Sequence, residues 1–142
     1  MRSRLDERGS ASIEAVVAGP AVVLLILLVN FGGRVALAHQ GVQSVAADAA
    51  RAASLARTQT EARTSAQTAA AAGLDQQLPC ASHALDLDLT GFRAPVGTPA
   101  AVSATLSCRV ATADLGLPGL PDLTIEATMT SPIDTWRERA RR

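Results

Sequence analysis

Between Glu14 and Arg34 the chain carries no charged residue over 19 consecutive positions. A helix needs about 20 predominantly apolar residues to cross the hydrocarbon core of a bilayer, so the run has a membrane-spanning length. It is apolar all round and lacks the polar stripe of a helix that packs on a soluble core. Gly19-Pro20 falls early in the run; membrane helices tolerate proline there, although it can kink them. We therefore predict a transmembrane helix over residues 10–34.

Arginines flank this segment unequally. Arg2, Arg4 and Arg8 precede it, whereas Arg34 is the only arginine that follows it before residue 51. An excess of basic residues marks the cytoplasmic side of a membrane segment. The sequence thus predicts a cytoplasmic N-terminus and an extracytoplasmic C-terminus.

The chain has two cysteines, Cys80 and Cys108, and both follow the apolar run. An even number of cysteines in an exported segment favours one disulfide, whereas a cytosolic chain would favour two unpaired buried thiols. With the C-terminal side exported, we predict a bond between Cys80 and Cys108. Closing a loop of this length contributes about 3–4 kcal/mol in a chain-entropy argument.

A short charged leader ends in Gly9, and Glu14 follows five residues later at the edge of the apolar run. A carboxylate in a membrane segment costs a few kcal/mol on insertion scales, so we expect Glu14 to have a use. The stretch Arg8-Gly9-Ser10-Ala11-Ser12-Ile13-Glu14 resembles the processing site of a type IV prepilin. Within that group it is most similar to the TadE-like minor pseudopilins of the tight-adherence (Flp, type IVb) pilus system.

This resemblance is most specific over residues 8–34 and looser over the small-residue stretch 45–53. There Asp48 and Ala52 stand where family members often have Glu and Gly. The resemblance implies that a prepilin peptidase cuts between Gly9 and Ser10, and that Glu14 then pairs with a neighbouring subunit's N-terminal amine. It also implies a role in assembling, or being incorporated into, a Flp pilus or related secretion apparatus. The implied partners are the peptidase, other pilin or pseudopilin subunits, the assembly machinery and membrane lipid.

Two other interpretations stay open. Signal peptidase could cut after Ala38, at the A-x-A site Ala36-Leu37-Ala38, and release a secreted binding domain that begins at His39. Glu14 at the boundary and an uncharged run longer than an ordinary signal core count against this. Alternatively, the chain is a plain single-pass anchor that displays its C-terminal domain. The mature N-terminus separates cleavage after Ala38 from cleavage after Gly9.

From Val35 to about Ala72, small apolar residues recur at spacings of three and four, which predicts that the helix continues through residues 35–73 and stops at Gly73. An alternative for the alanine-rich part is a solvated, partly frayed helix. Gly32-Gly33 and Gly41 are points where the helix could bend.

Three later segments alternate apolar and polar residues with period two, as half-buried strands do: 84–89, 101–110 and 123–129. Glycines and prolines separate them and indicate turns. The apolar face of such a sheet needs a cover, and the long helix is the candidate. We therefore predict an α+β, pilin-like fold: a leader (1–9), a transmembrane helix (10–34), its extracytoplasmic continuation (35–73), and a small three-stranded antiparallel domain (74–142).

Composition and motifs argue against other classes of function. The formal net charge is zero, which does not favour nucleic-acid binding. Phe31, Phe92 and Trp136 are the only aromatic residues, and the sequence lacks a phosphate loop, a nucleophile elbow and a His-Glu metalloprotease motif. We expect neither an enzyme nor a cofactor.

The residues that could bind a metal ion fit structural or solvent-facing roles better than a metal site. Cys80 and His83 have ligand-like spacing, but His39 and Cys108 stand alone, whereas structural zinc sites normally bring two close pairs. Asp86 and Asp88 alternate along one predicted strand and should share its solvent face.

The C-terminal segment 132–137 looks like the closing segment of some TadE-like sequences. We expect Trp136 to fold back onto the sheet as ordinary packing. The basic end that follows carries Arg137, Arg139, Arg141 and Arg142. It suits either a solvated face or contact with acidic cell-surface polymers, of which solvation is the simpler expectation.

Overall fold

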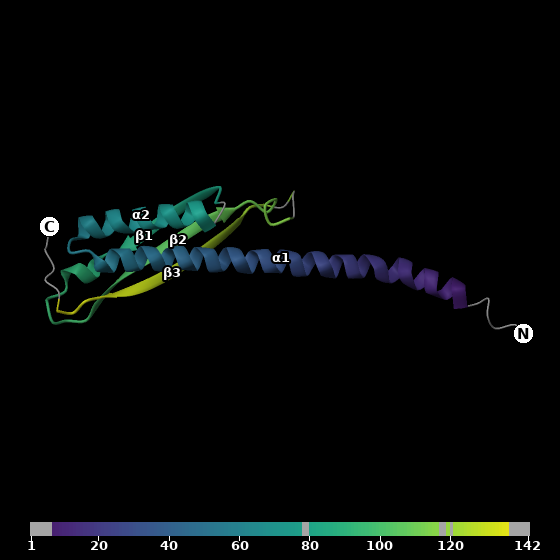
Figure 1. Cartoon of the computed structure of the whole chain (residues 1–142), viewed down its shortest axis with the longest axis horizontal. Helices are drawn as coiled ribbons and strands as arrows, with labels where there is room; N and C mark the ends of the chain where they lie inside the picture. The colour runs from purple at the N-terminus through teal and green to yellow at the C-terminus, as the bar shows by residue number, and fades with distance from the viewer. Residues whose placement is uncertain (1–6, 78–79, 117–118, 120, 137–142) are drawn as a thin grey trace, which may run out of the picture. The chain divides into compact units, whose positions relative to one another are not determined.

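The computed structural model describes residues 7–77, 80–116, 119 and 121–136, with side chains described from residue 16 onward except at 17 and 77. The chain divides into two units, residues 1–35 and 36–142. The first element, α1, is the helix Glu7–Leu55 (Figure 1). It begins inside the expected leader, and residues 1–6 of that leader lie outside the described part of the chain.

In the first unit the helix passes through Gly19-Pro20 and Gly32-Gly33 without interruption. Proline inside a helix removes one backbone hydrogen bond, but neighbouring bonds maintain the helical path. The sequence suggested these positions, together with Gly41, as possible bends. Helix α1 continues through all of them.

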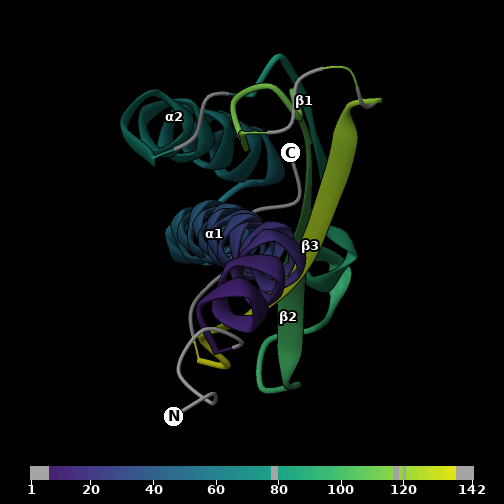
Figure 2. The ribbon, with the colours of Figure 1, turned by 90° about the vertical axis from the view of Figure 1, so that its right-hand side faces the viewer.

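The second unit adds a second helix and a sheet. In chain order it contains the C-terminal part of α1, then α2 (Gln59–Gln77), β1 (Ser82–Asp88), the 3-10 helix η1 (Thr90–Arg93), β2 (Ala100–Val110) and β3 (Leu123–Ile133). The three strands are antiparallel in the order β1-β2-β3. Both helices lie on one face of this sheet (Figure 2). The predicted α+β class and three-stranded antiparallel sheet are confirmed.

The prediction of one helix over residues 35–73 is wrong. Helix α1 ends at Leu55, residues 56–58 are non-helical, and α2 begins at Gln59. The chain then folds back, so that α2 lies beside α1 (Figures 1 and 2). The sheet therefore has a cover of two helices instead of one.

A capping box starts the second helix. The backbone N–H of Glu61 donates to Thr58 Oγ1 at 3.1 Å, and the Glu61 carboxylate accepts from the backbone N–H of Arg57 at 3.0 Å. The first bond occupies an amide of the first turn that has no partner within the helix, and the second ties the Glu61 side chain to the residue before Thr58. The sequence Thr58-Gln59-Thr60-Glu61 is the recognisable signal for this start.

Gly73 has a different role from the predicted helix stop, because α2 continues past it to Gln77. A Cβ atom at position 73 would lie 2.8 Å from Cγ2 of Val45, whose side chain is fully buried on α1. Gly73 therefore lets the backbone of α2 approach α1 closely. Alanines at every fourth position, Ala62, Ala66 and Ala70, continue this buried contact face of α2.

We expect Gly73→Leu to lower the free energy of unfolding of the second unit by about 1–3 kcal/mol or more, because the new side chain overpacks the α1–α2 contact. Urea unfolding of the full chain in mild detergent, followed by circular dichroism, measures the change. Ala71→Leu is a matched control, because residue 71 is exposed on the same helix. Equal stability of the two variants would contradict the close-approach role of Gly73.

The core lies between the two helices and the inner face of the sheet. Alternate residues of β2 are buried, as the period-two pattern predicted: Val102, Ala104, Leu106, Cys108 and Val110. Ile125 and Ala127 of β3 extend this surface, and Val42, Val45, Ala46 and Ala49 of α1 face it from the helical layer. Ser131 Oγ donates to Ser54 Oγ at 3.0 Å, which joins β3 to α1.

The outer face of the sheet is polar. The register places Asp86 of β1, Thr105 of β2 and Thr128 of β3 in one row, and the two threonine hydroxyls lie 2.9 Å apart. The next row contains Asp88, Ser103 and Thr130.

Candidate functional site

The apolar part of α1 within the first unit is the most distinctive surface of the chain. Nine of its large side chains are at least half exposed, whereas Phe31 is half-buried: Val16, Val22, Val23, Leu24, Leu25, Ile26, Leu27, Leu28 and Val29. Water is an unfavourable environment for so much contiguous apolar surface, whereas lipid or other helices would cover it. Among the described residues, α1 is the one helix long and apolar enough to cross a membrane. This feature fits a single-pass membrane anchor.

Gly9, Ser10 and Glu14, the predicted processing and assembly residues, all lie in the described backbone of α1. Their side chains lie outside the described part, so their predicted roles stay predictions. Since an α-helix rises 1.5 Å per residue, the five-residue spacing puts Glu14 about 7 Å along the axis from Gly9. The described apolar surface begins at Val16, two residues after Glu14.

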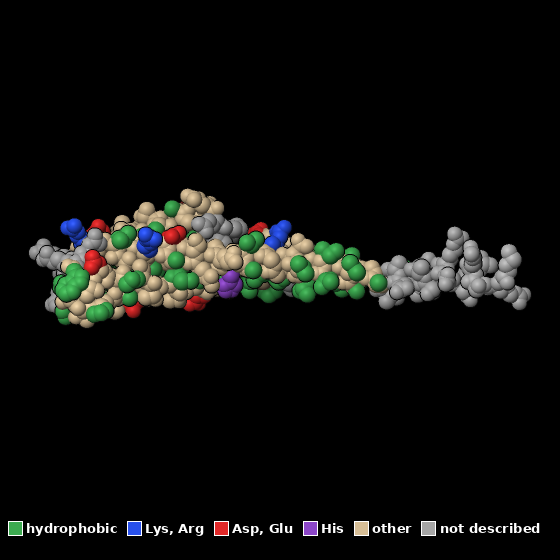
Figure 3. Space-filling view, turned by 60° about the horizontal axis from the view of Figure 1, so that its bottom comes forward, with side chains coloured by type: hydrophobic (Ala, Val, Ile, Leu, Met, Phe, Trp, Pro, Cys, Tyr) green, Lys and Arg blue, Asp and Glu red, His purple; other side chains and the backbone are tan. Residues whose placement is uncertain are grey.

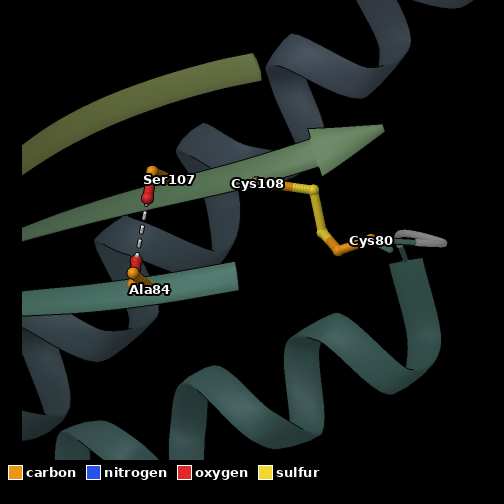
Figure 4. The surroundings of a disulfide bond; sticks show 4 residues. All are labelled: Cys80, Ala84, Ser107 and Cys108. Atoms are coloured by element: carbon orange, nitrogen blue, oxygen red, sulfur yellow. Dashed lines mark hydrogen bonds between the residues drawn. A yellow bond between two sulfur atoms is a disulfide. The ribbon is translucent and has the colours of Figure 1, made fainter. Parts of the chain in front are cut away.

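Cys80 and Cys108 form a disulfide, with their Cα atoms 5.5 Å apart, so the predicted pairing is confirmed (Figure 4). Cys80 lies between α2 and β1, and Cys108 projects from β2 into the core, where it is fully buried. Beside it, the backbone N–H of Ala81 donates to the carbonyl of Arg109 at 2.8 Å. The bond therefore fixes the connection that follows α2 to the central strand.

The disulfide also excludes Cys80 and Cys108 as ligands of a metal ion in this region. Both thiols are bonded to each other, so neither can serve as a thiolate ligand beside His83 or His39. Within the described residues, no three His, Cys, Asp or Glu side chains are placed to hold a metal ion together.

Asp86 and Asp88 are both exposed on the outer face of β1, as predicted. The backbone N–H of Thr90 donates to Asp88 Oδ1 at 2.9 Å, and the Thr90 side chain also hydrogen-bonds this carboxylate. These hydrogen bonds hold the pKa of Asp88 below its usual value, because they favour the charged form. Asp88 thus closes the turn that leads into η1, a structural role.

The expectation that Trp136 packs onto the sheet is wrong. Its side chain is 82 % exposed, although its backbone is fixed by a hydrogen bond from its N–H to Asp134 Oδ1 at 3.0 Å. The inner face of the sheet is already covered by the helices, and the outer face is polar.

Together these features define a chain with one helix suited to a membrane and a disulfide-bonded α+β unit. Residues 9–51 match the family model described as TadE-like protein, and this confirms the predicted TadE-like resemblance over those residues. The family match associates the chain with the Tad pilus system and with pilus components in general. No curated protein and no solved structure matches the chain significantly.

Proposed function

We propose that this chain is a minor pseudopilin of a Flp-type tight-adherence pilus or related secretion apparatus. A prepilin peptidase cuts it after Gly9, and it then takes part in assembly of the apparatus or is incorporated into it. The observation that carries the proposal is the TadE-like match over residues 9–51, which includes Gly9, Ser10, Glu14 and the whole exposed apolar segment. The proposed role is structural and not catalytic.

The disulfide supports an orientation with the N-terminus in the cytoplasm and residues 36–142 outside it. Structural disulfides persist in oxidising compartments, and Cys80 and Cys108 both belong to the second unit. The arginines that precede the apolar segment support the same orientation through the positive-inside rule.

In the proposed mechanism, the helix of the cleaved subunit leaves lipid and enters a bundle of subunit helices. The exposed apolar side chains of α1 suit both environments. A Cβ atom at Gly19, Gly32 or Gly33 would meet no described atom within 4 Å. These glycines therefore have no packing role within the described chain, while small residues allow neighbouring helices to approach closely.

We expect Gly9→Val to keep its leader when the cognate prepilin peptidase is present, because a small residue must fit the cleavage pocket next to Ser10. Intact-mass measurement of the membrane fraction tests this. The parent chain should lose the mass of residues 1–9, and the variant should retain it.

Gly19→Val is the matched control, since it introduces the same side chain into the same helix at a position with open surroundings. This control should be processed as the parent is. A mature Gly9→Val chain that begins at Ser10 would refute the proposed processing site. A parent chain that begins at His39 would instead identify cleavage after Ala38.

A further inference from the structure

Asn30 is the one polar side chain of the sequence between Glu14 and Arg34. It is exposed on α1, and the residues before it, Leu28 and Val29, are exposed apolar side chains. A polar group in a membrane-spanning helix is costly unless it has a partner, so such a residue points to a function.

The amide of Asn30 is directed back along the helix. Its Nδ2 donates to the backbone carbonyl of Ile26 at 2.8 Å, four residues earlier. Arg34, the charged residue that closes the apolar run, lies about 12 Å further along the axis than Ile26 at 1.5 Å per residue. The amide is therefore turned toward the apolar segment and away from the end of that segment marked by Arg34.

This bond uses only part of the hydrogen-bonding capacity of Asn30. A carboxamide has two N–H donors and a carbonyl acceptor, and the bond to Ile26 takes one donor. Within the described residues, the structure gives the side chain no second hydrogen bond. In a bilayer the acyl chains offer neither donors nor acceptors, so the remaining N–H and C=O need a partner that supplies both.

A second copy of this chain supplies that partner. One carboxamide is complementary to another, because each can donate to the carbonyl of the other. Since the arginines before the apolar run orient every copy in the same way, a second copy carries its Asn30 amide at the same depth in the membrane. A two-fold axis along the helices then brings the two amides together.

The residues around Asn30 have the spacing of a helix-pairing seam. Alternate steps of three and four residues connect the positions of this seam, here called the Asn30 face: Val16, Gly19, Val23, Ile26, Asn30 and Gly33. All of them are at least partly exposed, and Figure 3 shows hydrophobic side chains gathered along this part of α1. Asn30 occupies the same position of the repeat as Val23, and a single asparagine at such a position fixes the register and number of paired helices.

We propose that the chain forms a parallel dimer in the membrane, in which the Asn30 faces of two copies pack together and the two Asn30 amides hydrogen-bond each other. Gly19 and Gly33 lie on this face and let the two backbones approach closely. The dimer is a property of the uncut chain in the bilayer. It does not rest on cleavage after Gly9 or on pilus assembly.

Cysteine cross-linking of the full chain in phosphatidylcholine vesicles tests which face pairs. Cys80 and Cys108 are bonded to each other, so an introduced cysteine is the free thiol that an oxidant can couple between copies. Ile26→Cys should give a covalent dimer on mild oxidation. Leu28→Cys is the matched control, because it lies about 3 Å away along the axis but on the opposite face of α1, and it should stay monomeric.

Energy transfer between donor- and acceptor-labelled full chains in the same vesicles measures the dimer without cross-linking. Asn30→Leu should raise the dissociation constant of the dimer roughly tenfold, because it removes the amide pair. Ala21→Leu introduces the same side chain on the opposite face and should leave dimerisation unchanged. Circular dichroism of both variants checks that the helix is retained.

A further variant moves the amide to the other side of the helix. The double change Asn30→Leu, Leu28→Asn should shift cross-linking from a cysteine at position 26 to one at position 24. Equal cross-linking of Ile26→Cys and Leu28→Cys would overturn the proposal, as would full dimerisation of Asn30→Leu. A chain that stays monomeric until another pilus subunit is added would also overturn it, in favour of a partner of different sequence.

Discussion

Cys80→Ser should lower the free energy of unfolding of the second unit by roughly 3–4 kcal/mol, because the unfolded chain gains the freedom of an open loop. The bond joins positions separated by 28 residues. Small domains have a total stability of only about 5–15 kcal/mol, so this loss is a large fraction of the whole. Urea unfolding of the full chain in mild detergent, with and without reductant, measures it.

Cys80 is the better position for this test because it is less buried than Cys108. Cys108→Ser should destabilise the unit further, since it also buries a hydroxyl group in the core. The reduced parent and Cys80→Ser should have the same stability, and reductant should have no effect on the variant. A parent chain whose stability is insensitive to reductant would show that the disulfide makes no contribution.

The strands were predictable because a strand with one buried face alternates apolar and polar residues along the sequence. The segments 101–110 and 123–129 fall within β2 and β3, and residues 84–89 overlap all but the first two residues of β1. Leu106 and Cys108 face the core, while Thr105 before them and Ser107 between them do not. One buried face and one solvated face leave few alternatives for the register.

The break between the helices was missed because alanine dominates both sides of it. Alanine has the highest helix propensity and occurs before Leu55 and after Thr58, so the periodicity runs on through residues 56–58. The capping box at Thr58–Glu61 is a short local signal within that pattern. Gly73 was predicted to end a helix, but the helix continues past it. Its small size instead allows close contact with Val45, which only tertiary packing reveals.

Trp136 was misplaced for a related reason. A single tryptophan in the segment that follows the last predicted strand is most simply a core residue, since burial of its ring is strongly favourable. The alanine periodicity predicted one long helix, so a second helix on the inner face of the sheet was not expected. The same error therefore hid both the second helix and the exposed indole. The processing residues Gly9 and Ser10 and the assembly residue Glu14, by contrast, were proposed from the resemblance of residues 8–34 to TadE-like pseudopilins.

Glu14→Ala should be cut after Gly9 and remain in the membrane, yet fail to co-purify with pilus components or support piliation. In a plain anchor, removal of this carboxylate would cost nothing and would slightly improve membrane insertion. In the proposed bundle, Glu14 pairs with the amine of Ser10 on a neighbouring subunit, and the pair fixes the axial register. Loss of one partner leaves the other charge buried, at a cost of about 3–5 kcal/mol.

The readouts for this prediction must come from one sample, because a processing defect would imitate an assembly defect. Intact-mass measurement reports leader cleavage, whereas co-purification and piliation report assembly. Glu126→Ala is the control, since Glu126 is an exposed carboxylate on β3 and its loss should affect none of these readouts. Glu14→Gln keeps the shape but not the charge, so it should fail as Glu14→Ala does if the ion pair is responsible. Normal piliation by fully cleaved Glu14→Ala would favour the plain anchor, because such an anchor needs no charged partner at the membrane edge.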